Sequence, residues 1–349
     1  MKSMLLTLDY ELYGNGSGNV FKHIIEPTDN ILAMAQKYNA KITFFFEVIE
    51  YWKLKEEWEK GNSMGYQQNP IDAIERQLCE ACRHGHDIQL HLHPQWVDAR
   101  WENGKWVVNV EKWRLGGYNG EGDYTLTNLF KRGKQTLEDL LRPIKPNYEC
   151  IAMRAGGFNI QPSDDIVKSM HEAELTIDSS IYPGGKETGV YSNYDYTNIS
   201  PDIGIWEVGT TLEAEGKSGI LELPIVAFPM IRFKKFMTWE RVKGFIRNRK
   251  SAQENLAAKT SSVTKKSSVW DKVKYFFQIE WQTWDYCLFS SLLHKQFLKK
   301  VSLQKRDILV LVGHPKSYSD SRGMEYLLKE AEKAKYKFET MSEIWHQYK

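Results

Sequence analysis

The chain has 349 residues, of which 42% are hydrophobic and 26% are charged, and this is the composition of a soluble globular protein. A net charge of +2 argues against a nucleic-acid binder, and no apolar run approaches the ~20 residues that cross a bilayer. The first residues, MKSMLLTLDYE, lack the apolar core of a cleavable signal peptide, so we expect a cytoplasmic protein.

Apolar strands alternate with amphipathic helices along most of the chain. In chain order we expect a strand at 4–12, a helix at 26–40, a strand running into a helix at 41–52, a helix at 70–85 and a strand at 86–93. A tryptophan-rich loop at 96–124 is followed by a helix at 125–144, a strand at 150–158, a helix at 162–175, a short strand and turn at 176–185, strands at 219–228 and 307–317, and a last helix at 322–336. Such alternation is typical of parallel βαβ units.

Polar side chains cluster where the predicted strands end. They are Asp9, Glu11, His91, His93, Arg154, Asp178, Glu222 and His314. In a (β/α) barrel such ends converge on one mouth, where active sites lie, whereas in a doubly wound sheet they meet along an edge crevice. Because so many strands contribute, we expect an α/β fold that is a distorted, incomplete (β/α) barrel with parallel strands.

Residues 230–306 interrupt this pattern with 18 Lys or Arg against 5 Asp or Glu, mixed with aromatic residues. We expect an inserted basic, aromatic-rich helical segment at 230–306, and a barrel domain formed by 1–229 and 307–349. The charge indicates an anionic partner such as a phosphorylated substrate, a lipid head group or the membrane surface. A solvated helical pair with lysines on its surface has the same composition, so that alternative stays open.

Two pairs of polar residues have the spacing of one strand face. His91 and His93 lie in an alternating strand, so both imidazoles point the same way, and Asp9 and Glu11 share this spacing at the end of the first strand. Imidazoles and carboxylates that hold a divalent metal, with one position left to water, form a hydrolytic centre. The alternatives are histidines on a solvated strand face and carboxylates that cap nearby backbone.

Two further strand ends carry residues suited to catalysis. Arg154 is followed by two glycines, and it can hold a catalytic carboxylate, bind a substrate anion or form a structural ion pair. His314 follows a fully apolar strand, and it can protonate a leaving group or bond to loop backbone.

The ordered set LTLDYE, HGHDIQLHLHP, RAGG and LVGHP resembles the polysaccharide deacetylases with NodB homology. The resemblance covers residues 1 to about 185 and about 305 to 320. It implies a metal-dependent carbohydrate esterase or amidase on a distorted (β/α) barrel. It further implies that Asp9 is the catalytic base, that Arg154 and His314 match the third and final motifs, and that Asp178 roughly matches the acidic fourth motif.

Other residues occupy two of the family's metal-ligand positions in this chain. The second aspartate of the family falls on Tyr10, and its second histidine falls on Gln95. We expect Glu11 and His93 to replace them and to hold the metal together with His91. The resemblance is therefore to a divergent, intracellular branch of the family.

We thus expect a metal-dependent hydrolase, with zinc as the favoured metal, that removes an N-acetyl or related acyl group from a sugar precursor of a surface polysaccharide. The expected partner is a carbohydrate substrate, and in one form of this hypothesis the sugar is linked to phosphate or lipid. We also expect a peripheral membrane contact through 230–306 and no nucleic-acid partner. Two alternatives remain: a glycoside hydrolase that uses Asp9 with Glu11 or Glu222 and no metal, and a catalytically decayed carbohydrate-binding scaffold.

Overall fold

The computed structural model describes residues 2–231, 277–318 and 321–349. Its centre is a curled sheet in which the strands follow the order β10-β11-β7-β6-β3-β2-β1-β14, with β15 beside β1. Neighbouring strands are parallel except for the antiparallel β10–β11 pair. The strands of this sheet are β1 (Ser3–Tyr10), β2 (Ile42–Glu47), β3 (Asp87–Leu92), β6 (Ala152–Ala155), β7 (Ile177–Asp178), β10 (Trp206–Glu207), β11 (Leu221–Glu222), β14 (Ile308–Gly313) and β15 (Lys337–Phe338).

The sheet curls into an open half-barrel. Beyond β11 the chain turns so that Ile225 forms a parallel bridge with Val310 of β14, and Asp285 forms another with Val312. The free side of β14 is therefore partly covered by single bridges instead of a full strand. The predicted fold class, a distorted and incomplete (β/α) barrel of parallel strands, is confirmed.

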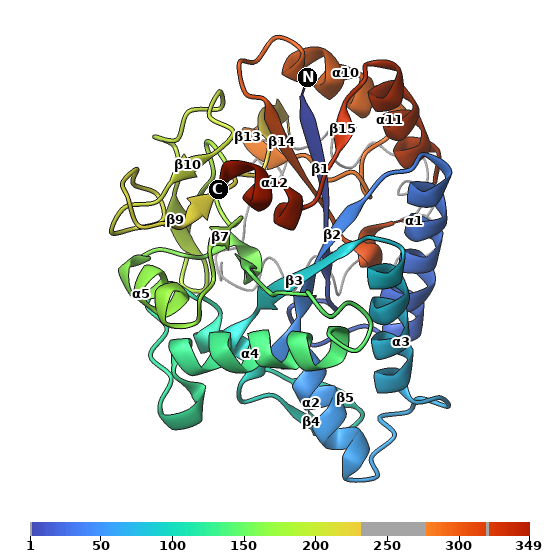
Figure 1. Cartoon of the computed structure of the whole chain (residues 1–349). Helices are drawn as coiled ribbons and strands as arrows, with labels where there is room; N and C mark the ends of the chain where they lie inside the picture. Colours follow the sequence, from blue (N-terminus) through green and yellow to red (C-terminus); the bar gives the residue numbers. More distant parts are fainter. Residues whose placement is uncertain (1, 232–276, 319–320) are drawn as a thin grey trace.

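Helices surround the curled sheet, and Figure 1 shows α1, α3 and α4 on its outside. The described helices are α1 (Glu26–Lys37), α2 (Val48–Glu59), α3 (Pro70–Arg83), α4 (Leu126–Leu141), α5 (Asp164–Glu172), α10 (Ser291–Val301), α11 (Ser321–Lys333) and α12 (Met341–Tyr348). No helix among the described residues is both long and apolar enough to cross a membrane.

Helix boundaries follow from local capping chemistry. Asn69 accepts a hydrogen bond from the Ile71 N–H at the start of α3, and Thr125 begins α4 in the same way. Ser163 precedes α5, but its hydroxyl donates to Glu213 at 2.5 Å and does not cap the helix. The helix predicted at 162–175 therefore begins two residues later, at Asp164.

The strands are buried on both faces, which is why they are so apolar in sequence. All residues of β2 and β3, and all but the first residue of β1, are buried. Alternation sends neighbouring side chains to different layers: the Tyr10 hydroxyl donates to Gln77 of α3 at 2.8 Å, whereas Asp9 faces Arg154 of β6 across the inside of the barrel. The polar side chains inside the barrel therefore come from alternate strand positions.

The described residues of the predicted insertion, 230–231 and 277–306, contain strand as well as helix. Strand β13 (Ile279–Thr283) pairs antiparallel with β12 (Ala227–Ile231), and Trp284 and Tyr286 beyond it are buried in the common core. Helix α10 follows and contacts α11. The remaining residues of the predicted insertion, 232–276, lie outside the described residues, so the domain boundaries stay a prediction.

Two short hairpins lie apart from the main sheet. They are β4 (Arg100–Glu102) with β5 (Lys105–Val107), and β8 (Lys186–Thr188) with β9 (Asn193–Asp195). The first hairpin lies within the tryptophan-rich stretch that was predicted as a loop. Its edge-to-face contacts of Trp106 with Trp96 and Trp101 explain why this stretch is ordered.

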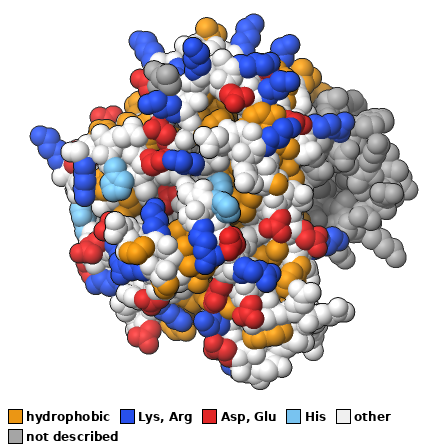
Figure 2. Space-filling view, turned by 45° about the vertical axis from the view of Figure 1, so that its right-hand side comes forward, with side chains coloured by type: hydrophobic (Ala, Val, Ile, Leu, Met, Phe, Trp, Pro, Cys, Tyr) orange, Lys and Arg blue, Asp and Glu red, His pale blue; other side chains and the backbone are white. Residues whose placement is uncertain are grey.

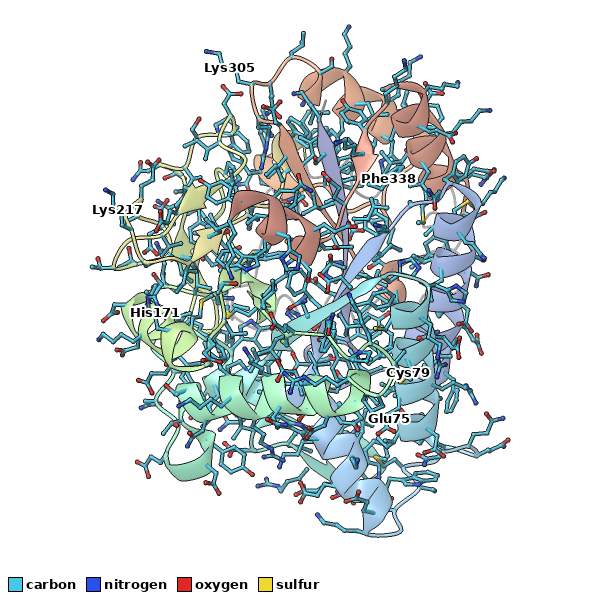
Figure 3. All side chains as sticks on the ribbon, viewed as in Figure 1. Glu75, Cys79, His171, Lys217, Lys305 and Phe338 are labelled. Carbon is cyan, nitrogen blue, oxygen red and sulfur yellow. The ribbon has the colours of Figure 1, made fainter. Side chains whose placement is uncertain are left out.

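Charged side chains cover the outer surface. Figure 2 shows Lys and Arg interspersed with Asp and Glu on one face, in keeping with the net charge of +2. In Figure 3 the labelled Lys217 and Lys305 point away from the ribbon. The polar residues inside the barrel are thus set apart from this ordinary mixed surface.

Candidate metal centre and catalytic site

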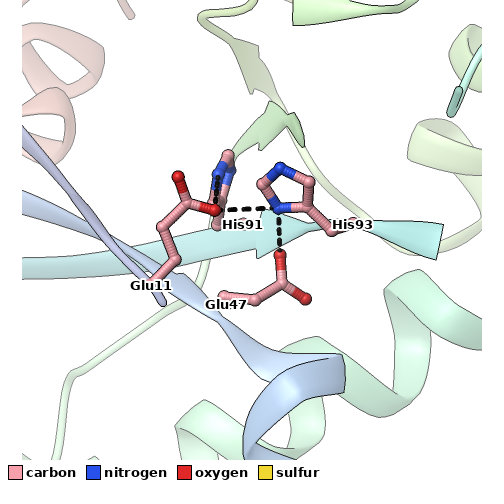
Figure 4. Close-up of side chains that lie close together, drawn as sticks. All are labelled: Glu11, Glu47, His91 and His93. Carbon is pink, nitrogen blue, oxygen red and sulfur yellow. Dashed lines mark hydrogen bonds and ion pairs between the residues drawn. The ribbon is translucent and has the colours of Figure 1, made fainter. Parts of the chain in front are cut away.

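Four buried side chains meet at the carboxyl ends of three adjacent strands. Glu11 follows β1, Glu47 ends β2, and His91 and His93 lie at the end of β3 and just beyond it. Each offers one ligand atom, and these atoms all lie within 4.8 Å of one another (Figure 4). Glu47 and His91 are direct partners in the β2–β3 register, so the parallel pairing itself brings them together. We call Glu11, Glu47, His91 and His93 the metal group.

The distances within the metal group are those of side chains that share one centre. The His93 Nδ1 atom lies 2.8 Å from Glu47 Oε2 and 3.0 Å from Glu11 Oε2. The same Glu11 oxygen lies 3.6 Å from His91 Nε2. Donors of two imidazoles and two carboxylates are a set that zinc and similar divalent ions accept.

The tautomer of His91 is fixed by a backbone contact. Its Nδ1 atom lies 2.8 Å from the carbonyl oxygen of Arg154, which can only accept, so Nδ1 carries the proton. A neutral imidazole then directs the Nε2 lone pair toward the metal group. This Nε2 atom is buried, and it has no hydrogen-bond partner among the described residues. A buried, orphaned lone pair of this kind fits a metal ligand.

The electrostatics of the metal group favour a cation. Burial alone would lower the pKa of His91, but the Glu11 carboxylate, 3.6 Å from Nε2, and the charges of Asp9 and Glu47 outweigh it and raise the pKa to about 9, so the Nε2 position attracts positive charge, either a proton or a metal ion. Burial alone would raise the pKa of Glu11, but Lys316 and then the two histidines hold it well below its usual value. Glu11 is therefore an ionised carboxylate in a buried place.

Glu47 was not among the residues predicted from sequence. It ends the strand ITFFFE, and its carboxylate also accepts the Ile49 N–H at 3.2 Å at the start of α2. The signal available in the sequence was a lone acid at the end of an apolar strand. Such an acid is more often a helix cap, and here it is both a cap and a member of the metal group.

Asp9 is held by an arginine inside the barrel. Arg154 donates from Nη1 to Asp9 Oδ1 at 2.6 Å and to Thr7 Oγ1 at 2.8 Å. The guanidinium also donates to Ser179, and it lies over the Phe45 ring at 4.1 Å. Burial alone would raise the pKa of Asp9, but Arg154, His91 and His314 outweigh it and lower the pKa below its usual value. Asp9 is thus a fixed, ionised carboxylate.

His314 faces the free oxygen of Asp9 and is oriented by a second carboxylate. Its Nε2 atom lies 3.6 Å from Asp9 Oδ2, and its Nδ1 atom lies 3.0 Å from Asp285 Oδ2. The other oxygen of Asp285 accepts from the Cys287 and Leu288 N–H groups at 3.0 and 3.1 Å, which fixes the carboxylate. The His314 side chain is 21% exposed, so solvent reaches the site from this side.

Asp285 was also missed in the sequence, because it lies within the stretch predicted as an inserted segment. Asp178 was predicted instead as the acid of the fourth motif. In the structure, Asp178 accepts hydrogen bonds from the Ser180 hydroxyl at 2.7 Å and from the Ser180 N–H at 3.1 Å. The carboxylate that contacts His314 is therefore that of Asp285, and the catalytic role of Asp178 stays a prediction.

The two glycines after Arg154 are explained by close packing. A Cβ atom on Gly156 would lie 2.2–2.4 Å from the ring atoms of His93, and Gly157 has a φ of +59°. Any larger residue at position 156 would push the imidazole out of the metal group. The RAGG stretch thus supplies both the arginine that holds Asp9 and the space that His93 needs.

The two positions where the chain departs from the family pattern also have a structural reason. Tyr10 points outward to α3, so a ligand at position 10 would face away from the metal group. Gln95 lies in a short 3-10 helix after His93, where its Nε2 donates to the Gly14 carbonyl at 3.4 Å. Glu11 and His93, the predicted replacements, are both in the metal group.

Comparisons with known proteins give structural neighbours only. No protein-family model matches the sequence, and no curated protein matches it. The chain is similar in structure to a polysaccharide deacetylase candidate from Mycobacterium smegmatis, with 12% identity over 99% of this chain and 90% of that chain and a TM-score of 0.47.

Two further solved structures are similar to a comparable degree. One is 4-alpha-glucanotransferase from Thermococcus litoralis, with 11% identity over 99% of this chain and 40% of that chain and a TM-score of 0.44. The other is Puue allantoinase, with 11% identity over 99% of this chain and 89% of that chain and a TM-score of 0.43. Likeness at this level concerns the fold and decides neither activity nor substrate.

Proposed function

We propose that this protein is a metal-dependent hydrolase that removes an N-acetyl or related acyl group from a sugar. The observation that carries the proposal is the meeting of the metal group with Asp9 and His314 at the carboxyl ends of the barrel strands. A metal site beside a fixed carboxylate and an oriented imidazole is suited to hydrolysis. The motif resemblance to polysaccharide deacetylases supports an N-acyl sugar as the substrate.

Glu11, Glu47, His91 and His93 would hold the divalent ion, and zinc suits this donor set. When bound, the ion would supply Lewis acidity, which lowers the pKa of water and polarises a carbonyl oxygen. The residues themselves fix the position of such an ion, because hydrogen bonds hold two of them: Glu47 accepts from the Ile49 N–H at the start of α2, and His91 Nδ1 donates to the Arg154 carbonyl.

Asp9 is the candidate general base. Arg154 occupies its Oδ1 and keeps the carboxylate ionised, while Oδ2 remains directed toward His314. A carboxylate held in this way can accept a proton from attacking water, with the guanidinium preventing rotation of the group. Arg154 therefore positions the base and does not itself need to contact the substrate.

His314 is the candidate general acid. Asp285 accepts its Nδ1–H, so Nε2 is the nitrogen that faces Asp9 and the solvent side of the site. An imidazole oriented by a carboxylate can donate a proton from Nε2 to a leaving amine. Asp9 and His314 thus divide acid and base roles between two neighbouring strands, β1 and β14.

We also propose that the substrate is a precursor of a surface polysaccharide, linked to a nucleotide or a lipid, and not a finished polymer. The basic composition of residues 230–306 supports an anionic group on the substrate or on a nearby surface. The peripheral membrane contact predicted through this segment stays a prediction, because residues 232–276 lie outside the described residues.

The test is acetate release by the purified, zinc-loaded protein from three probes: an N-acetylglucosamine oligosaccharide, UDP-N-acetylglucosamine and a lipid-linked N-acetylglucosamine. We expect release with one of the linked sugars, its loss with a chelator, and a fall of about 10²- to 10⁴-fold in kcat for Asp9→Asn and for His314→Ala. Release of sugar that is insensitive to chelator would favour the glycoside hydrolase. No release from any probe would argue against the deacetylase.

A further inference from the structure

Lys316 makes two hydrogen bonds beside the metal group. Its Nζ atom donates to Glu11 Oε1 at 2.7 Å and to the Leu12 carbonyl oxygen at 2.6 Å, and it lies 5.6 Å from the centre of the Tyr13 ring. The Lys316 side chain is only 11% exposed. Lys316 lies two residues after His314, in the short helix Pro315–Ser317, so one loop supplies the candidate general acid and this contact.

The two oxygens of the Glu11 carboxylate have different partners. Oε2 faces the two histidines, at 3.0 Å from His93 and 3.6 Å from His91. Oε1 accepts a hydrogen bond from Lys316 Nζ. The carboxylate is therefore divided between the metal group on one side and an ammonium on the other.

The backbone beside Glu11 is held as well. The Leu12 N–H donates to the buried carboxyl group of Glu50 at 3.0 Å, while the Leu12 carbonyl accepts from Lys316. The peptide groups that follow Glu11 are thus fixed on both sides. A glutamate has one more rotatable bond than an aspartate, so an orientation this definite needs such contacts.

We propose that Lys316 keeps Glu11 a one-oxygen ligand, so that a coordination position of the metal stays open for water or substrate. Carboxylates bind metals through one oxygen or through both, and an oxygen that accepts from a buried ammonium is not free to bind. Catalytic metal sites keep such an open position, whereas structural sites are closed. The inference rests on the proposed function, since it concerns the same metal group.

A purely electrostatic role for Lys316 makes a different prediction. An ammonium beside a divalent ion repels it, so removal of the charge alone would tighten metal binding and leave the coordination number unchanged. The proposed role instead predicts a change in coordination, because the freed Oε1 atom of Glu11 turns to the metal. The visible spectrum of bound Co²⁺ separates the two, since its intensity falls as the coordination number rises.

The experiment compares Co²⁺-loaded wild-type protein with Lys316→Met, Lys316→Arg and Lys217→Met. Lys217 is exposed and points away from the barrel, so its variant is the matched control (Figure 3). We expect Lys316→Met to bind Co²⁺ with a loss of visible absorption intensity. Lys316→Arg keeps a cationic donor and should restore most of the wild-type intensity, and Lys217→Met should leave the spectrum unchanged.

Three results would overturn the inference. A Lys316→Met spectrum equal to that of wild type would show that Lys316 does not set the coordination number. A folded Lys316→Met protein that binds no Co²⁺ would show that Lys316 is needed for binding itself. Wild-type protein that binds no Co²⁺ would remove the proposed function as well, so the two failures are distinguishable.

Discussion

At the residue scale, the site is made of pairs in which one side chain fixes another. Arg154 fixes Asp9, and Asp285 fixes His314. The sequence predicted Asp9, Arg154 and His314, because each follows or ends an apolar strand. It could not predict Asp285, because the stretch around it has neither a strand pattern nor a motif, and its contact with His314 spans 29 residues.

Replacement of Asp285 by Asn tests the role of the second pair. Asparagine has the same shape but no charge, so Nδ1–H of His314 loses its ionic acceptor and the ring loses a fixed orientation. We expect kcat for acyl release to fall by about 10- to 100-fold with metal content unchanged. Asp123→Asn, at an exposed position, should change neither. Wild-type kcat in Asp285→Asn would show that His314 does not depend on this contact.

At the scale of elements, the long apolar strands and amphipathic helices could be predicted because their periodicity is local. The two-residue strands β7, β10 and β11 could not be bounded, because they are defined by pairing with distant partners. The position of Glu47 in the metal group depends on strand pairing. The parallel β2–β3 register, and not the sequence near Glu47, places it opposite His91. The metal group was therefore only partly predictable.

The β2–β3 pairing also contains a buried histidine that makes stability depend on pH. His86, just before β3, accepts the Ile42 N–H of β2 at 3.1 Å through Nδ1. Burial, and then the nearby His84 and Lys41, lower its pKa to about 4, against about 6.5 in an unfolded chain. Above pH 6.5 neither state binds the proton. As the pH falls from 6.5 to 4 the unfolded state binds it and the folded state does not, so stability falls, by ~3 kcal/mol at most.

The measurement is the free energy of unfolding of wild type and His86→Asn between pH 7 and pH 4. Asparagine can accept the Ile42 N–H but does not titrate. Other groups titrate in both proteins, so the difference between the two isolates His86. We expect wild type to lose more stability than His86→Asn over this range. Parallel pH profiles would show that His86 is not held neutral in the folded state.

At the scale of the whole molecule, the barrel brings together residues from both ends of the chain, since β1 lies between β2 and β14. The ordered motifs predicted this convergence, because parallel strands place their carboxyl ends on one side. The structure of residues 277–306 could not be predicted from composition, because their basic residues indicated a helical insertion. In the structure they form strand β13 and a buried turn that carries Asp285 to His314. The metal group is therefore assembled by the order of the strands and not by one local motif.

Metal content measured by elemental analysis tests that group most directly. Wild-type protein, reconstituted with zinc and freed of excess ion, should hold one divalent ion per chain. His91→Ala and Glu47→Gln should lose it, whereas His171→Ala, at an exposed position on α5, should retain it. Wild-type protein without bound metal, or His91→Ala and Glu47→Gln with the wild-type amount, would contradict the account.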